Sequence, residues 1–234
     1  MPKSTDVFVV GSINQDFVLK VERRPEPGET VTDADLSTHN GGKGANQAAA
    51  AALLGASVSF LGRVGDDEFG EPLVRALEEK GIDTTLIERA AGRQTGAAFI
   101  TVTPDGENAI TVAPGANRAI MLEDVDGASG AIRESRVLVA QMEVPKEVVG
   151  RAAEVAAGAV VTDSSSATHL PAPEVGVVDT TGAGDAFVGA LAVKLARGAS
   201  LEEAASYAVR AGAAAVTKEG AQGALPTPEV VETI

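Results

Sequence analysis

The sequence contains no cysteine. This absence excludes disulfide bonds, thiolate metal sites and cysteine nucleophiles. The chain also has no tryptophan and one tyrosine, and aromatic residues make up only 3% of it. Hydrophobic residues still reach 44%, which is enough to form a buried core and argues against wholesale disorder.

Basic residues are scarce as well. There are 19 Lys and Arg residues against 33 Asp and Glu, a formal net charge of −14. Because a nucleic-acid backbone must be neutralised by Lys and Arg, this balance argues against nucleic acid as a partner. An anionic substrate would have to be bound by local positive potential, since the overall field repels it.

The chain also lacks a long hydrophobic run. The longest uncharged stretch, Gly44 to Gly62, includes Asn46 and Gln47 and is rich in alanine. It predicts a buried helix, a turn and a strand rather than a membrane span. The N-terminus has no signal-peptide pattern. We therefore expect a cytoplasmic protein that does not associate with membranes, with residues 1–234 forming a single domain.

Short β-branched runs alternate along the chain with longer, alanine-rich amphipathic runs. This alternation predicts an α/β fold, a doubly wound and mostly parallel sheet with helices on both faces. The expected strands are Val7–Ile13, Val58–Leu61, Ala98–Thr103, Val137–Gln141, Ala159–Thr162 and Val175–Val178. The expected helices are Ala45–Leu54, Glu68–Lys80, Glu123–Arg133, Pro145–Ala157, Ala186–Arg197 and Leu201–Val216.

Two segments interrupt this alternation with strands alone. Residues 17–21 and 30–38 read as strands around a Pro-Glu-Pro-Gly turn, and 98–103 and 108–112 flank the hairpin dipeptide Asp-Gly. Inserted strands of this kind either cover a site as a lid or extend the sheet and only pack. Lid strands presented edge-on can also pair between subunits, so a homodimer through the lid is one expected arrangement.

Residues 39–47, His-Asn-Gly-Gly-Lys-Gly-Ala-Asn-Gln, form the first of two glycine-rich loops. Lys43 is followed by glycine rather than serine or threonine, and position 47 is Gln, so the loop matches neither a Walker A motif nor the dinucleotide fingerprint. Adjacent glycines let the backbone approach a ligand closely, and Lys43 and Asn46 can hydrogen-bond polyol oxygens. The alternative is a turn that carries a surface lysine.

The second loop, Asp-Thr-Thr-Gly-Ala-Gly-Asp at 179–185, lies between an expected strand and a long helix. Free N–H groups from Gly182 to Asp185, at the positive end of that helix, would bind anionic oxygen. Asp185 is then either an N-cap or a base that takes a proton from a hydroxyl attacking a phosphoryl group. The lysine-glycine loop in the same chain favours the second interpretation.

Several motifs resemble those of the ribokinase (PfkB-type) family of sugar and nucleoside kinases. They are GSINQD, GGKGANQA, GRVGDDEFG, QMEVP, DTTGAGDAF and AVTKEGAQGALPT. Their order and spacing match the family from Val7 to about Val161 and again from His169 to Pro226. The resemblance implies a doubly wound α/β domain with a small β-sheet lid, formed here by residues of the 17–38 and 98–112 segments.

The resemblance further implies ATP-dependent phosphorylation of ribose at O5. Asp185 would be the general base, and Gly182, Ala183 and Gly184 would line the anion hole for the γ-phosphoryl group. Nucleotide contacts are implied for Gly184, Asp185 and Val209. The positions that match the family's ribose contacts are Asn14, Asp16, Gly42, Lys43, Asn46 and Glu143. Carboxylates and amides suit a sugar because an unpaired buried partner penalises the wrong one.

The resemblance implies two kinds of metal ion as well. Magnesium would arrive with ATP. A monovalent cation, potassium, would act as an activator, bound largely through backbone carbonyls. The positions that match this cation site are Asp179, Thr181, Ala215, Lys218, Gly220 and Ala224. The family has a serine where this chain has Ala224, and often Asn or His near the adenine where it has Val209.

The chain departs from the family after Glu143. Two strand–helix units, on the order of 60–75 residues by the size of such units, are missing, and with them the family's NxxE and TLG nucleotide elements. The nucleotide-binding part is therefore expected to be incomplete around 158–172, with a deletion between about Val161 and His169. Three explanations stay open: the sequence omits residues that the molecule has, a true deletion keeps the sugar half-site, or 162–172 rebuilds the nucleotide site.

Three functions therefore compete. The chain is a ribose kinase, a kinase of the same family for another substrate such as fructose or a nucleoside, or a catalytically impaired sugar-binding fragment. Ranking sugars and nucleosides by kcat/KM separates the first two. Ribose binding without ATP binding would indicate the third.

Overall fold

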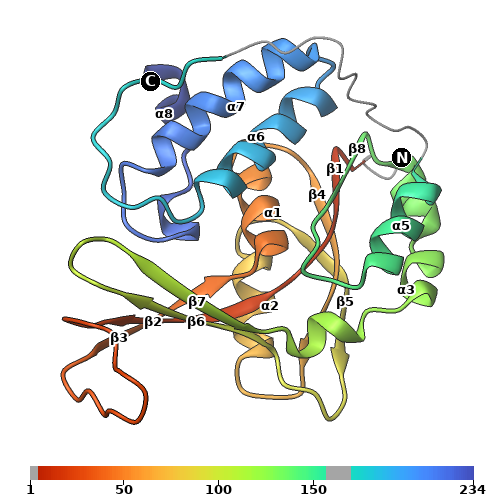
Figure 1. Cartoon of the computed structure of the whole chain (residues 1–234). Helices are drawn as coiled ribbons and strands as arrows, with labels where there is room; N and C mark the ends of the chain where they lie inside the picture. The colour runs from red at the N-terminus through yellow and green to blue at the C-terminus, as the bar shows by residue number, and fades with distance from the viewer. Residues whose placement is uncertain (1–4, 157–169) are drawn as a thin grey trace.

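The structure is a computed structural model of the chain, and it describes residues 5–156 and 170–234. At its centre lies a parallel sheet with the strand order β5-β4-β1-β8 (Figure 1). Its strands are β1 (Val7–Val10), β4 (Val58–Gly65), β5 (Asp83–Ala90) and β8 (Val137–Ala140). Parallel neighbours need crossover connections over the faces of the sheet, and the predicted α/β class is confirmed.

Helices cover both faces of this sheet. Because side chains alternate along a strand, Val7 and Val9 face one way and Phe8 and Val10 the other, and all four are fully buried. The Val7 face packs against α1, α2, α6, α7 and α8, and the Phe8 face against α3, α4 and α5. The helices are α1 (Lys43–Leu53), α2 (Gly70–Glu78), α3 (Leu122–Gly127), α4 (Ser129–Glu134), α5 (Lys146–Val155), α6 (Ala183–Ala196), α7 (Leu201–Ala215) and α8 (Pro228–Thr233), with short 3-10 turns η1 (Gly115–Ala119) and η2 (Gln222–Ala224).

α1 and α6 pack closely because small residues line their contact (Figure 1). A side chain at Gly189 would lie 2.5 Å from Cβ of Ala50 and 2.9 Å from the carbonyl oxygen of Gln47. Only glycine permits this approach. The contact brings the first turns of the two helices together, and each helix begins at one of the two glycine-rich loops.

A second sheet projects from the body as a lid (Figure 1). Its strands are β2 (Asn14–Lys20), β3 (Asp35–Gly41), β6 (Gly96–Val102) and β7 (Asn108–Ala113), in the order β3-β2-β6-β7. The predicted strand pairs are present, although β2 begins at Asn14 and β3 at Asp35 rather than at residues 17 and 30. The predicted hairpin joins β6 to β7, with Gly106 at a φ of 83°.

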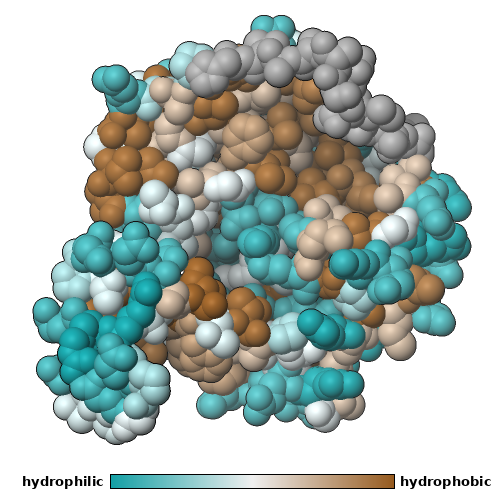
Figure 2. Space-filling view, viewed as in Figure 1, coloured by the Kyte–Doolittle hydropathy of each residue, from teal (hydrophilic) through white to brown (hydrophobic). Residues whose placement is uncertain are grey.

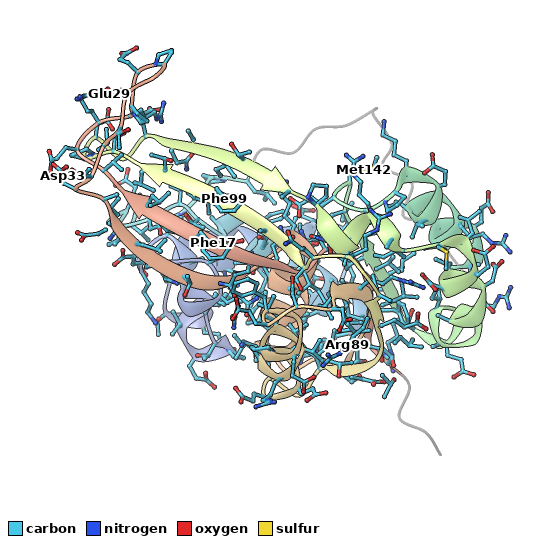
Figure 3. The ribbon with its side chains drawn as sticks, turned by 90° about the horizontal axis from the view of Figure 1, so that it is seen from below. Phe17, Glu29, Asp33, Arg89, Phe99 and Met142 are labelled. Atoms are coloured by element: carbon cyan, nitrogen blue, oxygen red, sulfur yellow. The ribbon has the colours of Figure 1, made fainter. Side chains whose placement is uncertain are left out.

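Phe17 anchors the lid to the body. Its ring stacks on Phe99 with centroids 5.3 Å apart and meets Phe69 edge-on at 5.6 Å. Phe69 immediately precedes α2, so this aromatic cluster, part of which is labelled in Figure 3, ties two lid strands to the main domain. The outer end of the lid carries exposed Glu29 and Asp33 and is hydrophilic (Figures 2 and 3).

One expected helix is divided. The segment predicted as a single helix at Glu123–Arg133 forms α3 and α4, which meet at Ala128. Gly127 and Gly130 flank this break, and glycine lowers helix stability because it has the greatest backbone freedom to lose.

The strand expected at Val175–Val178 is wrong. The N–H of Val178 donates to the carbonyl of Val216 at 2.8 Å, so the segment lies beside the end of α7. Val177 and Val178 are 63% and 66% exposed. A β-branched run forms a stable strand only when a neighbouring strand pairs with it. The strand expected at Ala159–Thr162 lies outside the described residues.

No helix within the described ranges, 5–156 and 170–234, has the length and apolar character needed to cross a bilayer.

Candidate active site

The carboxyl ends of β1 and β8 lead into the candidate site. Ser12 follows β1 and Glu143 follows β8, and the Ser12 hydroxyl donates to Glu143 Oε2 at 2.6 Å. These segments meet because parallel neighbours end at the same edge of the sheet. The first residue of α1, Lys43, reaches the same carboxylate, with its backbone nitrogen 3.3 Å from Oε2 and Nζ 3.4 Å from Oε1. The predicted lysine loop and Glu143 are therefore brought together.

Gly42 and Gly44 allow the lysine loop to lie directly on the backbone that follows β1. Gly42 has a φ of 91°, and a side chain there would lie 2.7 Å from the Ser12 carbonyl oxygen. At Gly44 a side chain would lie 2.6 Å from the Ser12 amide nitrogen. The sequence predicts that these glycines approach a ligand closely, but in the structure they lie against the backbone of Ser12.

Asp185 lies in the first turn of α6, but its carboxylate is held by α1. Asn46 Nδ2 donates to Oδ2 at 3.0 Å, and Gln47 Nε2 donates to Oδ1 at 2.9 Å. The N-cap of α6 is Gly182, with a φ of 79° and no side-chain cap. The interpretation of Asp185 as an N-cap is therefore wrong, and its two oxygens are turned toward the GGKGANQ loop.

The surroundings of Asp185 raise the pKa of its carboxyl group. Burial is the largest cause; the Asn46 and Gln47 donors oppose it, while the negative charge of Glu143 adds to it. A raised pKa brings a carboxylate closer to the range in which a general base is most effective.

Asp16 of β2 is a second buried carboxylate in this region. It is 8% exposed, and its Oδ1 accepts no hydrogen bond from the described residues. Burial, together with the charges of Glu143 and Asp185, raises its pKa to about 7. Gly41, opposite the start of β2, makes room for it, because a side chain at Gly41 would overlap the Asp16 carboxyl group.

Asn14 is oriented by a residue outside the predicted motifs. It is 3% exposed, and its Oδ1 accepts a hydrogen bond from Asn117 Nδ2 at 2.8 Å. Asn117 Oδ1 in turn accepts from the N–H of Ile13 at 2.9 Å. Asn117, in η1, therefore fixes the direction of the Asn14 amide.

The site is rich in buried acceptors. Asp16 Oδ1, Asn46 Oδ1 and Gln141 Oε1 are buried and accept no hydrogen bond within residues 5–156 and 170–234. Since buried polar atoms normally have partners, a ligand that suits this site must bring donors. The hydroxyl groups of a polyol are such donors.

The start of α6 provides N–H donors beside Asp185. The Ala183 N–H is occupied by the carbonyl of Thr180 at 3.3 Å, whereas Gly184 and Asp185 make no backbone N–H hydrogen bond to the described chain. Gly184 is exposed, and a side chain there would meet nothing within 4 Å. An anionic oxygen suits such a helix terminus, as the sequence predicts.

A cavity of about 360 Å³ lies between the lid and the main domain. The lid face that carries Asp16 lines one wall, and residues 177–181 and 219–221 line the other. Its size lies within the range of small-molecule sites.

Val209 lies on α7, in a separate hollow of about 600 Å³. Its neighbours there include Ala183, Gly184, Val175 and Val216, so the hollow reaches the start of α6. The structure brings Val209 close to the predicted anion hole but not into the cavity that Asp16 lines. Hydrophobic surface gathers in this upper part of the molecule, on the side of α6 and α7 (Figures 1 and 2).

The positions predicted for a monovalent cation come together in part. Asp179 Oδ1 accepts hydrogen bonds from the N–H and hydroxyl of Thr181 at 2.8 and 2.7 Å, and Oδ2 accepts from the Gly220 N–H at 2.8 Å. Burial raises the pKa of Asp179, but these hydrogen bonds outweigh it and the net shift is downward. Ala215 and Ala224, which precede and follow Gly220 in the chain, are buried. Neither has a side-chain oxygen, so each could offer a cation only its backbone carbonyl.

These groups are suitable ligands for a hard cation, because carboxylate and carbonyl oxygens are the donors that such ions prefer. Within the ranges that the structure describes, no group of three or more His, Asp or Glu side chains is placed to hold a metal ion. A cation bound here would therefore rely on backbone carbonyls around Asp179.

Four residues that shape the site were not among the predicted site residues. They are Ser12, Gln47, Asn117 and Gln141. Gln47 directly follows Asn46 in the glycine-rich motif, so it carried a usable signal. Gln141 begins the QMEVP motif two residues before Glu143, so it carried a signal as well, whereas Asn117 lies outside the quoted motifs and only the folded chain brings it to the site.

Known proteins share this sequence and this arrangement. The pfkB family of carbohydrate kinases matches residues 4–157 and 154–228. The chain belongs to the PfkB family. A ribokinase from Bacillus subtilis is 31% identical over 290 aligned positions, which cover 98% of this chain and 99% of the relative. The predicted family and the predicted kinase class are confirmed.

Solved PfkB-type structures agree. A ribokinase from Thermotoga maritima has a TM-score of 0.85 at 31% identity, with 98% of each chain covered. The ribokinase of Arabidopsis thaliana, complexed with ribose and ATP, has a TM-score of 0.81 at 26% identity, again with 98% of each chain covered.

This PfkB chain is shorter than its relatives at one internal place. The two matched segments meet at residues 154–157. The Bacillus subtilis alignment runs over 290 positions against 234 residues here, so at least 56 positions, 290 less 234, have no counterpart. The predicted internal shortening is confirmed, and the junction falls slightly before the predicted 161–169.

Proposed function

We propose that this chain transfers the γ-phosphoryl group of ATP to O5 of ribose. The observation that carries the proposal is the place of the Asp185 carboxylate. It lies at the N-terminus of α6 beside unoccupied N–H groups, and it is held by the Asn46 and Gln47 amides at the start of α1. Relatives named ribokinase, and a neighbour complexed with ribose and ATP, support the choice of substrates.

In the proposed reaction Asp185 takes the proton of the ribose 5-hydroxyl. As that oxygen bonds to the γ-phosphorus, the bond from phosphorus to the bridging oxygen breaks and ADP leaves. The unoccupied N–H groups of Gly184 and Asp185 would face the charge that develops on the transferred group. Magnesium bound to ATP supplies further charge neutralisation.

The remaining residues would hold the sugar. Asp16 and Asn46 present buried acceptors to hydroxyl groups, and Glu143 fixes Lys43 at the entrance. Asn14 would donate from the amide that Asn117 orients. Gly42 keeps the loop against the backbone on which these residues lie. Each of them matches a position assigned to ribose by the resemblance.

A potassium ion bound by the Asp179–Thr181 and Ala215–Ala224 segments would order the loop that begins α6. Asp179 already links Thr181 to Gly220 through hydrogen bonds. A cation coordinated by the carbonyls of these segments would stiffen the same link and hold the anion site in place. We therefore expect potassium to raise kcat more than it changes ribose affinity.

A second function is favoured by one observation. The chain lacks at least 56 of the positions aligned in its relative, and the resemblance implies that these positions belong to the nucleotide side. A chain of this length would then bind ribose without turnover. The nucleotide-binding part would be incomplete around residues 158–172, of which 158–169 lie outside the described residues.

The test is an ADP-release assay with ATP and ribose, run with and without potassium, beside calorimetry of each ligand alone. Turnover with ribose supports the kinase, and ribose binding without ATP binding supports the second function. Fructose, deoxyribose and inosine in the same assay test substrate preference. An intact mass several kDa above 23.6 kDa would show that the sequence omits residues.

We also propose a homodimer through the lid. Phe99 and Leu36, 46% and 61% exposed, lie on the lid face opposite to Asp16, and the edge strands β3 and β7 remain free to pair within the described chain. Light scattering on the purified protein tests the dimer, and Leu36→Glu should shift it to monomer. An unchanged mass in that variant would exclude the lid as the interface.

A further inference from the structure

A line of amide groups ends on the carboxylate of Asp185. Gln141 Nε2 donates to Gln47 Oε1 at 2.8 Å, and Gln47 Nε2 donates to Asp185 Oδ1 at 2.9 Å. The three residues come from different parts of the chain: the end of β8, the first half of α1 and the first turn of α6. This amide relay, Gln141–Gln47–Asp185, has one direction, because each amide accepts at its oxygen and donates at its nitrogen.

Because the relay is buried, the direction of its hydrogen bonds affects the Asp185 carboxylate. Gln47 is 6% exposed and Gln141 is 8% exposed, so water is poorly placed to substitute for a lost partner. The bond from Gln141 holds the oxygen of Gln47 away from Asp185 and thereby presents its N–H group. Without it, the Gln47 amide can turn and place its oxygen against the carboxylate, which an ionised acid rejects.

Asn46 and Gln47, the two side chains that donate to Asp185, differ in whether their amide oxygen is free to bind a ligand. Asn46 Oδ1 is buried and accepts no hydrogen bond from the described residues, so Asn46 has an end to offer a ligand. Both ends of the Gln47 amide are used inside the protein. Gln47 is therefore the constant partner of Asp185 Oδ1. Oδ2 is bound instead by Asn46, the amide that can also bind a ligand.

The backbone leaves space for the relay. A side chain at Gly11 would overlap Gln141 Oε1 and would lie 2.7 Å from Cα of Gly44. Glycine at both positions lets Gln141 extend across the end of β1 toward Gln47. Leucine or alanine at Gly11 would displace Gln141, so the relay depends on the same close packing that forms the lysine loop.

We propose that Gln47 and Gln141 are positioning residues that fix the carboxylate of Asp185, with Gln47 holding Oδ1 and Gln141 setting the orientation of Gln47, so that Oδ2 faces the sugar hydroxyl. This inference rests on the proposed role of Asp185 as general base. The structural part, that the relay controls the state of the Asp185 carboxylate, can be tested without turnover.

The test is a carbon-13 NMR titration of the Asp185 carboxyl group in the whole protein, without ligand. Gln47→Met keeps the length of the side chain but removes the donor. Charged groups near Asp185 are Glu143, Lys43 and Asp16, and these are the same in all variants. We expect the pKa of Asp185 to rise by about 1 unit in Gln47→Met, since hydrogen bonding to the charged form lowers a carboxyl pKa.

Gln141→Met should raise the pKa of Asp185 by a smaller amount, because Gln47 keeps its donor but loses its fixed direction. In the double variant the loss of Gln141 should add nothing further, since Gln141 acts only through Gln47. Gln94→Met, which removes an exposed amide that is not part of the relay, is the matched control and should leave the titration unchanged.

An unchanged pKa of Asp185 in folded Gln47→Met would overturn the inference, and additive effects of the two substitutions would overturn the role of Gln141. If Gln47→Met does not fold, Gln141→Met alone decides, with the same criterion. If the wild-type protein has turnover, Gln47→Met should lower kcat about tenfold, with ribose affinity within about threefold of wild type. Absence of turnover in wild type would count against the proposed function and not against the relay.

Discussion

The sugar side and the nucleotide side of the candidate site are built in different ways. On the sugar side, buried polar groups such as Asn14, Asn46 and Gln47 are joined to other side chains by hydrogen bonds at 2.8–3.0 Å. On the proposed nucleotide side, the hollow beside Gly184 is lined mostly by apolar residues, and Val177 among them is 63% exposed. One half is organised before any ligand binds, and the other is not.

Under the proposed function, this difference predicts that the sugar half carries the specificity. Buried acceptors and fixed amides discriminate between hydroxyl patterns because each mismatch leaves a polar group unpaired. An apolar hollow discriminates less, since apolar contact has no direction. Five substitutions break or sharpen this comparison.

The largest effect is expected at the point where the two halves meet. Asp185→Asn removes the proposed base while keeping its size, and should lower kcat by roughly 10²- to 10⁴-fold, the usual contribution of general base catalysis. Ribose affinity should change little, because the sugar contacts remain. ADP release and calorimetry measure the two quantities. Asp33→Asn, at the exposed outer end of the lid (Figure 3), is the control; a kcat equal to wild type in Asp185→Asn would refute the assignment.

A substitution confined to the proposed sugar side should weaken ribose binding without changing ATP binding. A methyl group at Gly41 would overlap the Asp16 carboxyl group, so Gly41→Ala should weaken ribose binding roughly 10- to 100-fold by displacing a buried polar group. Any ATP affinity should stay the same. Calorimetry tests both ligands. Gly150→Ala, in open space on α5, should leave both unchanged, and equal losses for ribose and ATP in Gly41→Ala would contradict the separation.

Asp16 and Asp179 should respond to pH with opposite sign. The pKa of Asp16 is raised to about 7, so the folded state holds a proton that the unfolded chain releases near pH 4, and stability falls as pH rises between these values. Asp16→Asn removes that penalty and should raise Tm at pH 8 by about 5 °C, which corresponds to roughly 2 kcal/mol for a chain of this size. At pH 4 the difference should disappear.

Asp179 provides the matched opposite case. Its pKa is lowered by hydrogen bonds from Thr181 and Gly220 despite burial, so its contribution to stability is present at neutral pH and is lost as pH falls below about 4. Asp179→Asn should therefore lower Tm at pH 8 and approach wild type in acid. Melting curves between pH 4 and 8 compare the two variants. The same sign of effect in both would show that burial alone controls these carboxyl groups.

The smallest effect is expected on the nucleotide side. Val209 lines the apolar hollow beside Gly184, where relatives often offer a polar side chain by the resemblance. Val209→Asn should lower the KM for ATP by about threefold, the equivalent of one modest hydrogen bond, with ribose affinity unchanged. Val112→Asn on the lid is the matched control. No change in the KM for ATP would indicate that the hollow does not bind the adenine ring.

The sequence predicts much of the site because its signals are local. The order of the motifs identifies both glycine loops, and Asp185 and Asn46 do lie within hydrogen-bond distance. The start of α7 is another local signal, because the Ser200 cap pairs with Glu203 only three residues further along the chain. The sequence indicates these features because each depends on residues that are neighbours in the chain.

Features that depend on distant partners were missed or wrong. Val175–Val178 has strand composition but lies beside the end of α7, because pairing needs a neighbour that composition cannot supply. β5 was not expected, since its polar, edge-like pattern resembles a loop until β4 pairs with it. Asn117 and Gln141 show the same limitation within the site, because their partners are Asn14 and Gln47.

The amino-acid sequence alone determined the class of fold, the two glycine loops and the chemistry of the residues that follow them. Spacing along the chain is enough for this, because a glycine, a helix start and a carboxylate act over a few residues. The tertiary structure decided which groups Asp185 contacts, that Asp16 is buried beside two other carboxylates, and which amides hold the base. Those depend on where strands end and how closely α1 and α6 pack, and such contacts exist only when the whole chain has folded.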